Sequence, residues 1–247
     1  MIVFCLASTR SGTTAISRCF RENPNFVNLG EVFYDTPESK GDYVKKWEYP
    51  APPSIEKFDE YLNFLQSDPQ YVYWLDIKFH DLNRFNPRQF SVNARPTLIE
   101  IIAKSGAPTV LIRRANHLRA ALSEIQAMTT GVYHVPQTYE IHAPPSDNRR
   151  DQIKTVEAIR SAMHRQSEFR VVDEHLRLHP NLFRVDYEAL FDCQDSAENR
   201  AALGAWIGVD AVSEPDLRKV ALDWPDWFDL DLAAKILQGT AYQWWVK

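Results

Sequence analysis

The chain has 247 residues, of which 45% are hydrophobic and 25% are charged, so it is a globular protein with enough length to bury a substantial core. Its formal net charge of −5 excludes nucleic-acid binding by bulk electrostatic attraction, although a local basic groove stays open. No apolar run is long enough to predict a membrane span, and the short apolar start lacks the basic flank of a signal peptide.

The three cysteines, Cys5, Cys19 and Cys193, are few and odd in number, and they do not have metal-ligand spacing. They predict a reducing compartment, and together with the missing signal peptide they favour the cytoplasm. Cys5 lies in an apolar run and is interpreted as a small core residue. We expect no metal site, because the seven histidines are scattered and no CxxC or HExxH pattern occurs.

Along the chain, the order strand, loop, helix recurs. Ile2–Ala7 is a continuous apolar run, typical of a buried parallel strand, and Gly12 opens a segment with helical spacing of apolar residues. A second strand is predicted at residues 26–29, and residues 34–54, rich in proline, tyrosine and charge, are interpreted as a loop or lid. Further strands are predicted at residues 71–79 and 108–114, with helices at 54–67, 95–106 and 116–128.

In the last part of the chain, residues 129–148 predict a second loop with several prolines. A long amphipathic helical stretch covers residues 150–176, and residues 181–190 predict a strand running into a helix with Asp186 as its N-cap. The remainder is interpreted as helical, with tryptophan-rich loops.

This order predicts an α/β fold, a three-layer sandwich with a mainly parallel central sheet and a P-loop-like phosphate-binding loop after the first strand. We expect one domain over residues 1–247, with variable acceptor loops near 34–54 and 129–150. Ligands of such sheets bind beyond the carboxyl ends of the strands. Three polar segments, at residues 8–14, 77–81 and 113–123, follow predicted strands, so one cleft is expected to gather them.

The first of these segments reads STRSGTT, Ser8 to Thr14. Backbone amides at Gly12–Thr14 are expected to hold an anion, with the hydroxyls of Ser11, Thr13 and Thr14 as further donors. Arg10 adds a fixed cation with planar donors. The alternative is an ordinary joint between a strand and a helix with hydroxyl caps.

The same segment differs from the nucleotide-triphosphatase pattern GxxxxGK[ST] at two positions. Ala7 stands in place of the first glycine, and Thr13 stands in place of the lysine that neutralises β- and γ-phosphates. The loop therefore fits a triphosphate poorly and fits a single phosphate better.

STRSGTT resembles the 5′-phosphosulfate loop of sulfotransferases that use 3′-phosphoadenosine-5′-phosphosulfate (PAPS), and is most similar to the bacterial glycolipid and carbohydrate branch. The resemblance implies PAPS as the sulfonate donor, with no metal. In that family an arginine at a strand end and a serine on the next helix bind the donor's 3′-phosphate. Arg114 and Ser123 match these positions, and Arg113 is a candidate for part of the role. The alternative is two solvated arginines and an incidental serine.

Two residues are candidates for the base that takes the acceptor's proton. Glu31, just after the second predicted strand, lies in a GE segment like the one that supplies the proposed base in the bacterial branch. His80 follows another strand and resembles the base of the Lys-x-His pattern in the cytosolic branch. We favour Glu31, because the loop form matches its branch, and Lys78 is then a candidate for steadying the transferring sulfonate. As alternatives, Glu31 is a carboxylate at a helix start and His80 a packed or capping imidazole.

The resemblance implies sulfonate transfer to a hydroxyl of a carbohydrate, glycolipid or small natural product. Two alternatives stay open: a P-loop small-molecule kinase, and a non-catalytic protein that binds the desulfated donor product, PAP. The oligomeric state is open, with a homodimer as one option. Five aromatic residues are candidates for stacking on an acceptor or, in the alternative, are core and loop-packing residues: Trp47, Tyr49, Tyr71, Tyr73 and Trp74.

Overall fold

The computed structural model describes residues 1–33, 54–83, 85, 96–130, 148–210, 212–213 and 224–246. They belong to two compact units, Met1–Arg113 with Phe169–Pro215, and Arg114–Glu168 with Asp216–Lys247. The acceptor loops predicted near residues 34–54 and 129–150 fall largely outside the described residues.

The first unit is built on a five-stranded sheet in which every neighbouring pair is parallel. Its strands have the order β2-β3-β1-β4-β5, so that β1 lies in the middle. The bounds are Ile2–Ala7 for β1, Phe26–Glu31 for β2, Val72–Lys78 for β3, Thr109–Arg113 for β4 and Leu182–Asp186 for β5. The predicted α/β fold with a parallel sheet is therefore confirmed.

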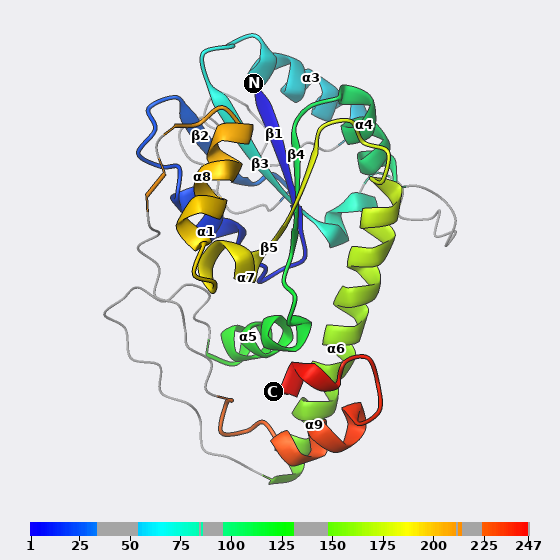
Figure 1. The fold of residues 1–247 in the computed structure, drawn as a ribbon. Helices are drawn as coiled ribbons and strands as arrows, with labels where there is room; N and C mark the ends of the chain where they lie inside the picture. The colour runs from blue at the N-terminus through cyan, green and yellow to red at the C-terminus, as the bar shows by residue number, and fades with distance from the viewer. Residues whose placement is uncertain are drawn as a thin grey trace. The chain divides into compact units, whose positions relative to one another are not determined.

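Helices cover both faces of this sheet (Figure 1). Because side chains alternate along a strand, Phe4 and Leu6 of β1 enter one core, and Val3 and Cys5 enter the other. The first core is closed by α3 (Ile55–Gln66), α4 (Thr97–Ser105) and the last turns of α6 (Asn148–His175). The second is closed by α1 (Thr13–Arg18), α7 (Tyr187–Phe191) and α8 (Ser196–Trp206). Cys5 is fully buried, as expected of a core residue.

The helix ends follow the sequence signals in two cases and differ in a third. Ser54 caps α3, where its hydroxyl accepts a hydrogen bond from the Lys57 amide at 3.3 Å. Gly106 ends α4 with a left-handed φ of 62°. Asp186 occupies the N-cap of α7, but its side chain makes no capping hydrogen bond, because both carboxylate oxygens accept from Arg113.

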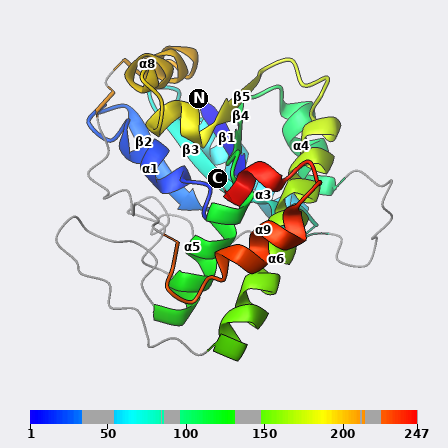
Figure 2. The same ribbon diagram turned by 60° about the horizontal axis from the view of Figure 1, so that its bottom comes forward.

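The second unit contains α5 (His117–Thr130), the first turns of α6, α9 (Leu230–Leu237) and the short 3-10 helix η3 (Gln243–Val246). Side chains from all of these elements form one hydrophobic core. Figure 2 shows the ribbons of α5, α6 and α9 near one another. Trp245 of η3 is 1% exposed and stacks on Tyr242 at 4.5 Å between ring centroids. No helix in the described ranges combines the length and the apolar character that crossing a membrane requires.

Candidate functional site

The carboxyl ends of the strands meet at one edge of the sheet, because all five strands run in the same direction. The register places Ala7 of β1 opposite Lys78 of β3, and Glu31 of β2 opposite Asp76 of β3. The loop of residues 8–12 leaves β1 at this edge and leads into α1. Glu31, Lys78 and the loop are thus brought together by strand pairing.

The loop turns through two residues with positive φ, Arg10 at 59° and Gly12 at 82°. A Cβ atom added to Gly12 would lie 2.2 Å from a ring carbon of Tyr187, so only glycine fits this turn beside that ring. The hydroxyls of Ser8 and Ser11 are 2.7 Å apart, and Ser11 is 1% exposed. The turn is therefore fixed by a ring packed on its glycine and by a buried hydroxyl pair.

Lys78 contacts the first residue of α1. Its side chain is 3% exposed, and its ammonium donates to the Thr13 hydroxyl at 2.7 Å and to Asp76 Oδ2 at 2.7 Å. Glu31 Oε1 lies 3.4 Å from the same ammonium. Burial lowers the pKa of Lys78, but the charges of Asp76 and Glu31 outweigh burial and raise it above its ordinary value. The ammonium therefore stays charged beside Thr13, the residue that stands where a triphosphatase loop has its lysine.

Glu31 is placed by an irregularity in β2. The prediction ended this strand at residue 29, but the structure continues it through Glu31 with a register shift between Asn28 and Glu31. The Asn28 side chain accepts from the Gly30 amide at 3.0 Å and donates to the Ser17 hydroxyl of α1 at 3.0 Å. Bulges of this kind re-aim a side chain. The Glu31 side chain keeps 39% of its surface exposed, so its carboxylate is accessible from solvent.

His80, the other candidate base, has a different environment. It belongs to the 3-10 helix η2 (Phe79–Asn83) after β3. Its side chain is 61% exposed, and its Nε2 atom lies 3.7 Å from Asp81 Oδ1. The contacts of the described residues thus tie Glu31 to Lys78 and the loop, while His80 pairs with its neighbour in sequence.

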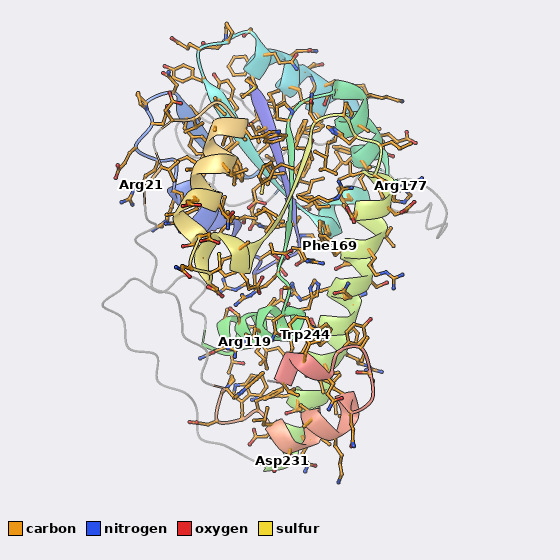
Figure 3. All side chains as sticks on the ribbon, viewed as in Figure 1. Arg21, Arg119, Phe169, Arg177, Asp231 and Trp244 are labelled. Carbon is orange, nitrogen blue, oxygen red and sulfur yellow. The ribbon has the colours of Figure 1, made fainter. Side chains whose placement is uncertain are left out.

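The two arginines at the end of β4, Arg113 and Arg114, belong to different units. Arg113 Nε and Nη2 each donate to a carboxylate oxygen of Asp186 at 2.6 Å, and the Arg113 guanidinium lies 5.8 Å from the ring centroid of Phe169. Phe169, labelled in Figure 3, comes from α6 and packs into the core of the first unit. Arg113 therefore joins β4 to β5 and α6.

Arg114 and Ser123 both fall in the second unit and are half-buried. Between them, Asn116 caps α5, since its Oδ1 accepts from the Arg119 amide at 3.1 Å. The Asn116 Nδ2 group donates to the Trp245 carbonyl at 3.0 Å. The segment that follows Arg114 is thus fixed to the C-terminal η3.

The aromatic candidates for acceptor stacking divide into three kinds. Tyr73 and Trp74 are 1% and 0% exposed and belong to the two cores, as the alternative interpretation held. Tyr71 is half-buried beside the first core. Trp47 and Tyr49 lie outside the described residues.

Three residues near the loop were missed in the sequence, namely Asn28, Asp76 and Tyr187. Asp76 had a visible signal, because it is a charge inside the apolar strand YVYWLDIKF. Asn28 and Gly30 form the kind of pair that marks a turn within a strand. Within the described ranges, no cluster of three or more His, Cys, Asp or Glu residues could hold a metal ion.

The chain is similar to two solved sulfotransferase structures. One is the sulfotransferase from Alicyclobacillus acidocaldarius, 14% identical with a TM-score of 0.48, over 99% of this chain and 98% of that chain. The other is the sulfotransferase domain of the Synechococcus PCC 7002 olefin synthase, 16% identical with a TM-score of 0.45, over 99% of this chain and 91% of that chain. No protein-family model matches the chain, and no curated protein matches it. Both likenesses are too weak to show a function.

Proposed function

We propose that this protein is a sulfotransferase that moves a sulfonate from PAPS to a hydroxyl of a carbohydrate, glycolipid or small natural product. The observation that carries the proposal is the contact of the Lys78 ammonium with both Thr13 of the loop and Glu31. One buried cation thereby joins an anion-binding loop to an exposed carboxylate. Sulfonate transfer needs both groups in one place.

The loop sequence favours PAPS over a triphosphate. STRSGTT resembles the 5′-phosphosulfate loop of the bacterial glycolipid and carbohydrate branch, and Thr13 replaces the triphosphatase lysine. Lys78 brings an ammonium to Thr13, but two carboxylates share it. The charge left over for a ligand is smaller than that of an unpaired lysine, which suits a sulfonate with one negative charge better than a terminal phosphate with two.

PAPS supplies a sulfonate that is already activated by its phosphate leaving group. Glu31 takes the proton from the acceptor hydroxyl as the new O–S bond forms and the S–O bond to the 5′-phosphate breaks. Arg10, the amides of Gly12–Thr14 and the loop hydroxyls stabilise the charge on the departing phosphate. Lys78 keeps the Thr13 hydroxyl and the Glu31 carboxylate in place and steadies the sulfonate between them.

Arg114 and Ser123 are the proposed ligands of the 3′-phosphate, because a guanidinium fork and a hydroxyl together satisfy a dianion. Asn116 fixes the backbone beside Arg114 by capping α5. This role also separates PAPS from ATP, which has no 3′-phosphate. The Arg114→Ala variant should therefore weaken binding of PAP without affecting any binding of ATP.

The first test is thermal unfolding of the full chain with PAP, and with ATP plus Mg²⁺ in parallel. A ligand at a hundred times its dissociation constant stabilises the folded state by about 2.7 kcal/mol. For a chain of this size, where 1 kcal/mol shifts Tm by about 2–4 °C, that corresponds to a rise in Tm of roughly 5–11 °C. We expect the rise with PAP, its loss in Arg114→Ala, and no rise with ATP. A rise with ATP alone would favour the kinase alternative and contradict the proposal.

Turnover separates the enzyme from a protein that only binds PAP. Radiolabelled PAPS is incubated with the chain and a panel of sugars, a glycolipid and phenols, and PAP release is measured. Release that depends on an acceptor supports the sulfotransferase. Binding of PAP without release from any of these mixtures favours the non-catalytic alternative.

A further inference from the structure

Asp76 is a buried carboxylate at the centre of the site, although it lies on the strand and not in the loop. It is 6% exposed, and its Oδ2 atom accepts from the Lys78 ammonium at 2.7 Å. Its Oδ1 atom is buried and has no hydrogen-bond partner among the residues that the structure describes. Burying a charge with half of its hydrogen-bonding capacity unused is costly. A strand in the middle of a sheet would be more stable with an apolar residue at this position. The presence of a carboxylate here therefore suggests a functional role.

One residue, Ile77, separates Asp76 from Lys78 along β3, so both side chains leave the same face of the strand. On the neighbouring strands, Cys5 of β1 and Glu31 of β2 are the register partners of Asp76. The Lys78 ammonium is thus flanked by Asp76 on its own strand, Glu31 on β2 and Thr13 on α1. Without Asp76, only the half-exposed Glu31 would balance the buried ammonium.

We infer that Asp76 is a positioning residue, which holds the Lys78 ammonium at the point where it reaches Thr13 and Glu31 at the same time. The inference rests on the proposed function, since it assigns Asp76 a part in the site that transfers the sulfonate. Asp76 touches neither donor nor acceptor and acts only through Lys78. The unpaired Oδ1 atom is the structural cost of keeping Oδ2 aimed at the ammonium.

Electrostatics support this role. Burial favours the neutral form of Lys78, and the charge of Asp76 is the largest influence that opposes burial and keeps the pKa of Lys78 high. Within the described part of the chain, the other groups around the ammonium are Glu31, Thr13 and the Cys5 thiol, whose pKa is raised well above its usual range by burial and then by Asp76. Cys5 therefore stays neutral, and Asp76 and Glu31 supply the balancing charge.

The test compares Asp76→Asn, Lys78→Met and the double variant in the full chain, with PAP release from PAPS and the acceptor panel as the readout. Loss of a hydrogen bond to a charged group predicts a fall in rate of about tenfold to a hundredfold for Asp76→Asn. In the Lys78→Met background, the same change should have no further effect, because Asp76 acts through Lys78. Additive losses in the double variant would overturn the inference.

Two variants control for general losses of stability. Thr109→Val removes a fully buried hydroxyl from β4, and Asp173→Asn removes the charge of a partly exposed carboxylate that accepts from Arg184 Nε at 2.6 Å in the same unit. Neither residue touches Lys78, so their PAP release should match that of the unmodified chain. If Thr109→Val lowers the rate as much as Asp76→Asn does, Asp76 has only a structural role and the inference fails.

A second readout does not depend on the proposed function. In protein labelled with ¹⁵N-lysine, the Lys78 ammonium resonance is identified by its loss in Lys78→Met, and its pH titration is followed. We expect Asp76→Asn to move that titration to lower pH and to speed hydrogen exchange. An unchanged Lys78 titration would overturn the inference. A changed titration in a chain that neither binds PAP nor releases it from PAPS would retain the positioning of Lys78 and reject the sulfotransferase.

Discussion

Two cations stand at the carboxyl edge of the same sheet, and they are held in opposite ways. Lys78 of β3 is 3% exposed and has oxygen atoms from Thr13, Asp76 and Glu31 around its ammonium. Arg113 of β4 is 42% exposed and forms a bidentate salt bridge with Asp186. The first is an ammonium sealed among several elements, and the second is a guanidinium open to water.

The difference separates a buried charge cluster, where we propose the chemistry, from a solvent-exposed ion pair at the same edge of the sheet. Attraction between charges falls steeply as water enters, so the Arg113 pair adds little beyond joining two strands. The Lys78 cluster is buried except at Glu31, where the carboxylate reaches the surface. Burying a charge network costs free energy, and one that ends in a partly exposed carboxylate beside the proposed anion-binding loop is suited to proton transfer.

The largest expected effect is that of Lys78→Met. Removing the ammonium leaves the buried Asp76 charge uncompensated, so the free energy of unfolding should fall by about 3 kcal/mol or more. The matched control is Lys57→Met, which removes an equally short 2.7 Å lysine–glutamate contact from an exposed helix face. Urea unfolding checks both, and the account requires the Lys57 loss to be about 1 kcal/mol or less. Equal losses would erase the distinction between the two kinds of contact.

Gly12→Ala should weaken PAP binding, because the added methyl group would clash with the Tyr187 ring and force the loop to shift. The new Cβ would lie 2.2 Å from the Tyr187 ring, at a φ of 82° that strains any residue with a side chain. Strain of this kind costs about 1–3 kcal/mol, which corresponds to roughly a fivefold to hundredfold loss of affinity if the loop shifts to relieve it. Calorimetric titration with PAP measures the loss, and Gly106→Ala, at an open helix end, is the control for positive φ alone. Unchanged affinity would show that the turn does not hold the ligand.

The pH dependence of stability should carry a Lys78 component. Because its pKa is raised in the folded state, its stabilisation is complete below about pH 10.4, the ordinary lysine value, and is lost as pH rises through the folded pKa. Burial also raises the pKa values of Cys5 and Tyr61, so the whole protein weakens in alkali. The deficit of Lys78→Met relative to the unmodified chain should therefore narrow above about pH 10.4. A deficit that stays constant through pH 11.5 (roughly one unit higher) would contradict this.

The smallest effect is expected for Arg113→Met. An ion pair that is nearly half exposed contributes about 1 kcal/mol or less, and salt screens it. Urea unfolding at low and high ionic strength should show a small loss that shrinks with salt. If Arg113→Met lowered the free energy of unfolding as much as Lys78→Met does, the Arg113 pair would have to be as well shielded from water as the Lys78 cluster.

Much of the fold could be predicted because it depends on local patterns. Residues close in sequence determine three of the predicted features: the apolar strand Ile2–Ala7, the N-cap at Ser54 and the helix end at Gly106. The parallel sheet follows from the repeated order of strand and helix. The bulge at the end of β2 was missed, because it depends on Asn28 bonding to Ser17 of another element.

The site was predictable as a set of residues but not as a network. Glu31, Lys78 and Thr13 were identified separately, whereas their contacts arise from strand register that no local pattern reports. Asp76 is visible as a charge inside an apolar strand, but its part in the site depends on its contact with Lys78 on the same strand. The acceptor loops remain a prediction, since they fall largely outside the described residues.

The most direct test of the account is PAP release from PAPS by Glu31→Gln and His80→Asn, each measured beside the unmodified chain with the same acceptor panel. Glutamine keeps the shape of Glu31 and its acceptor for Lys78 but cannot take a proton. The account predicts a fall of about a hundredfold or more for Glu31→Gln, with PAP binding retained, and little change for His80→Asn. Full activity in Glu31→Gln together with loss in His80→Asn would contradict it and make the exposed histidine the base.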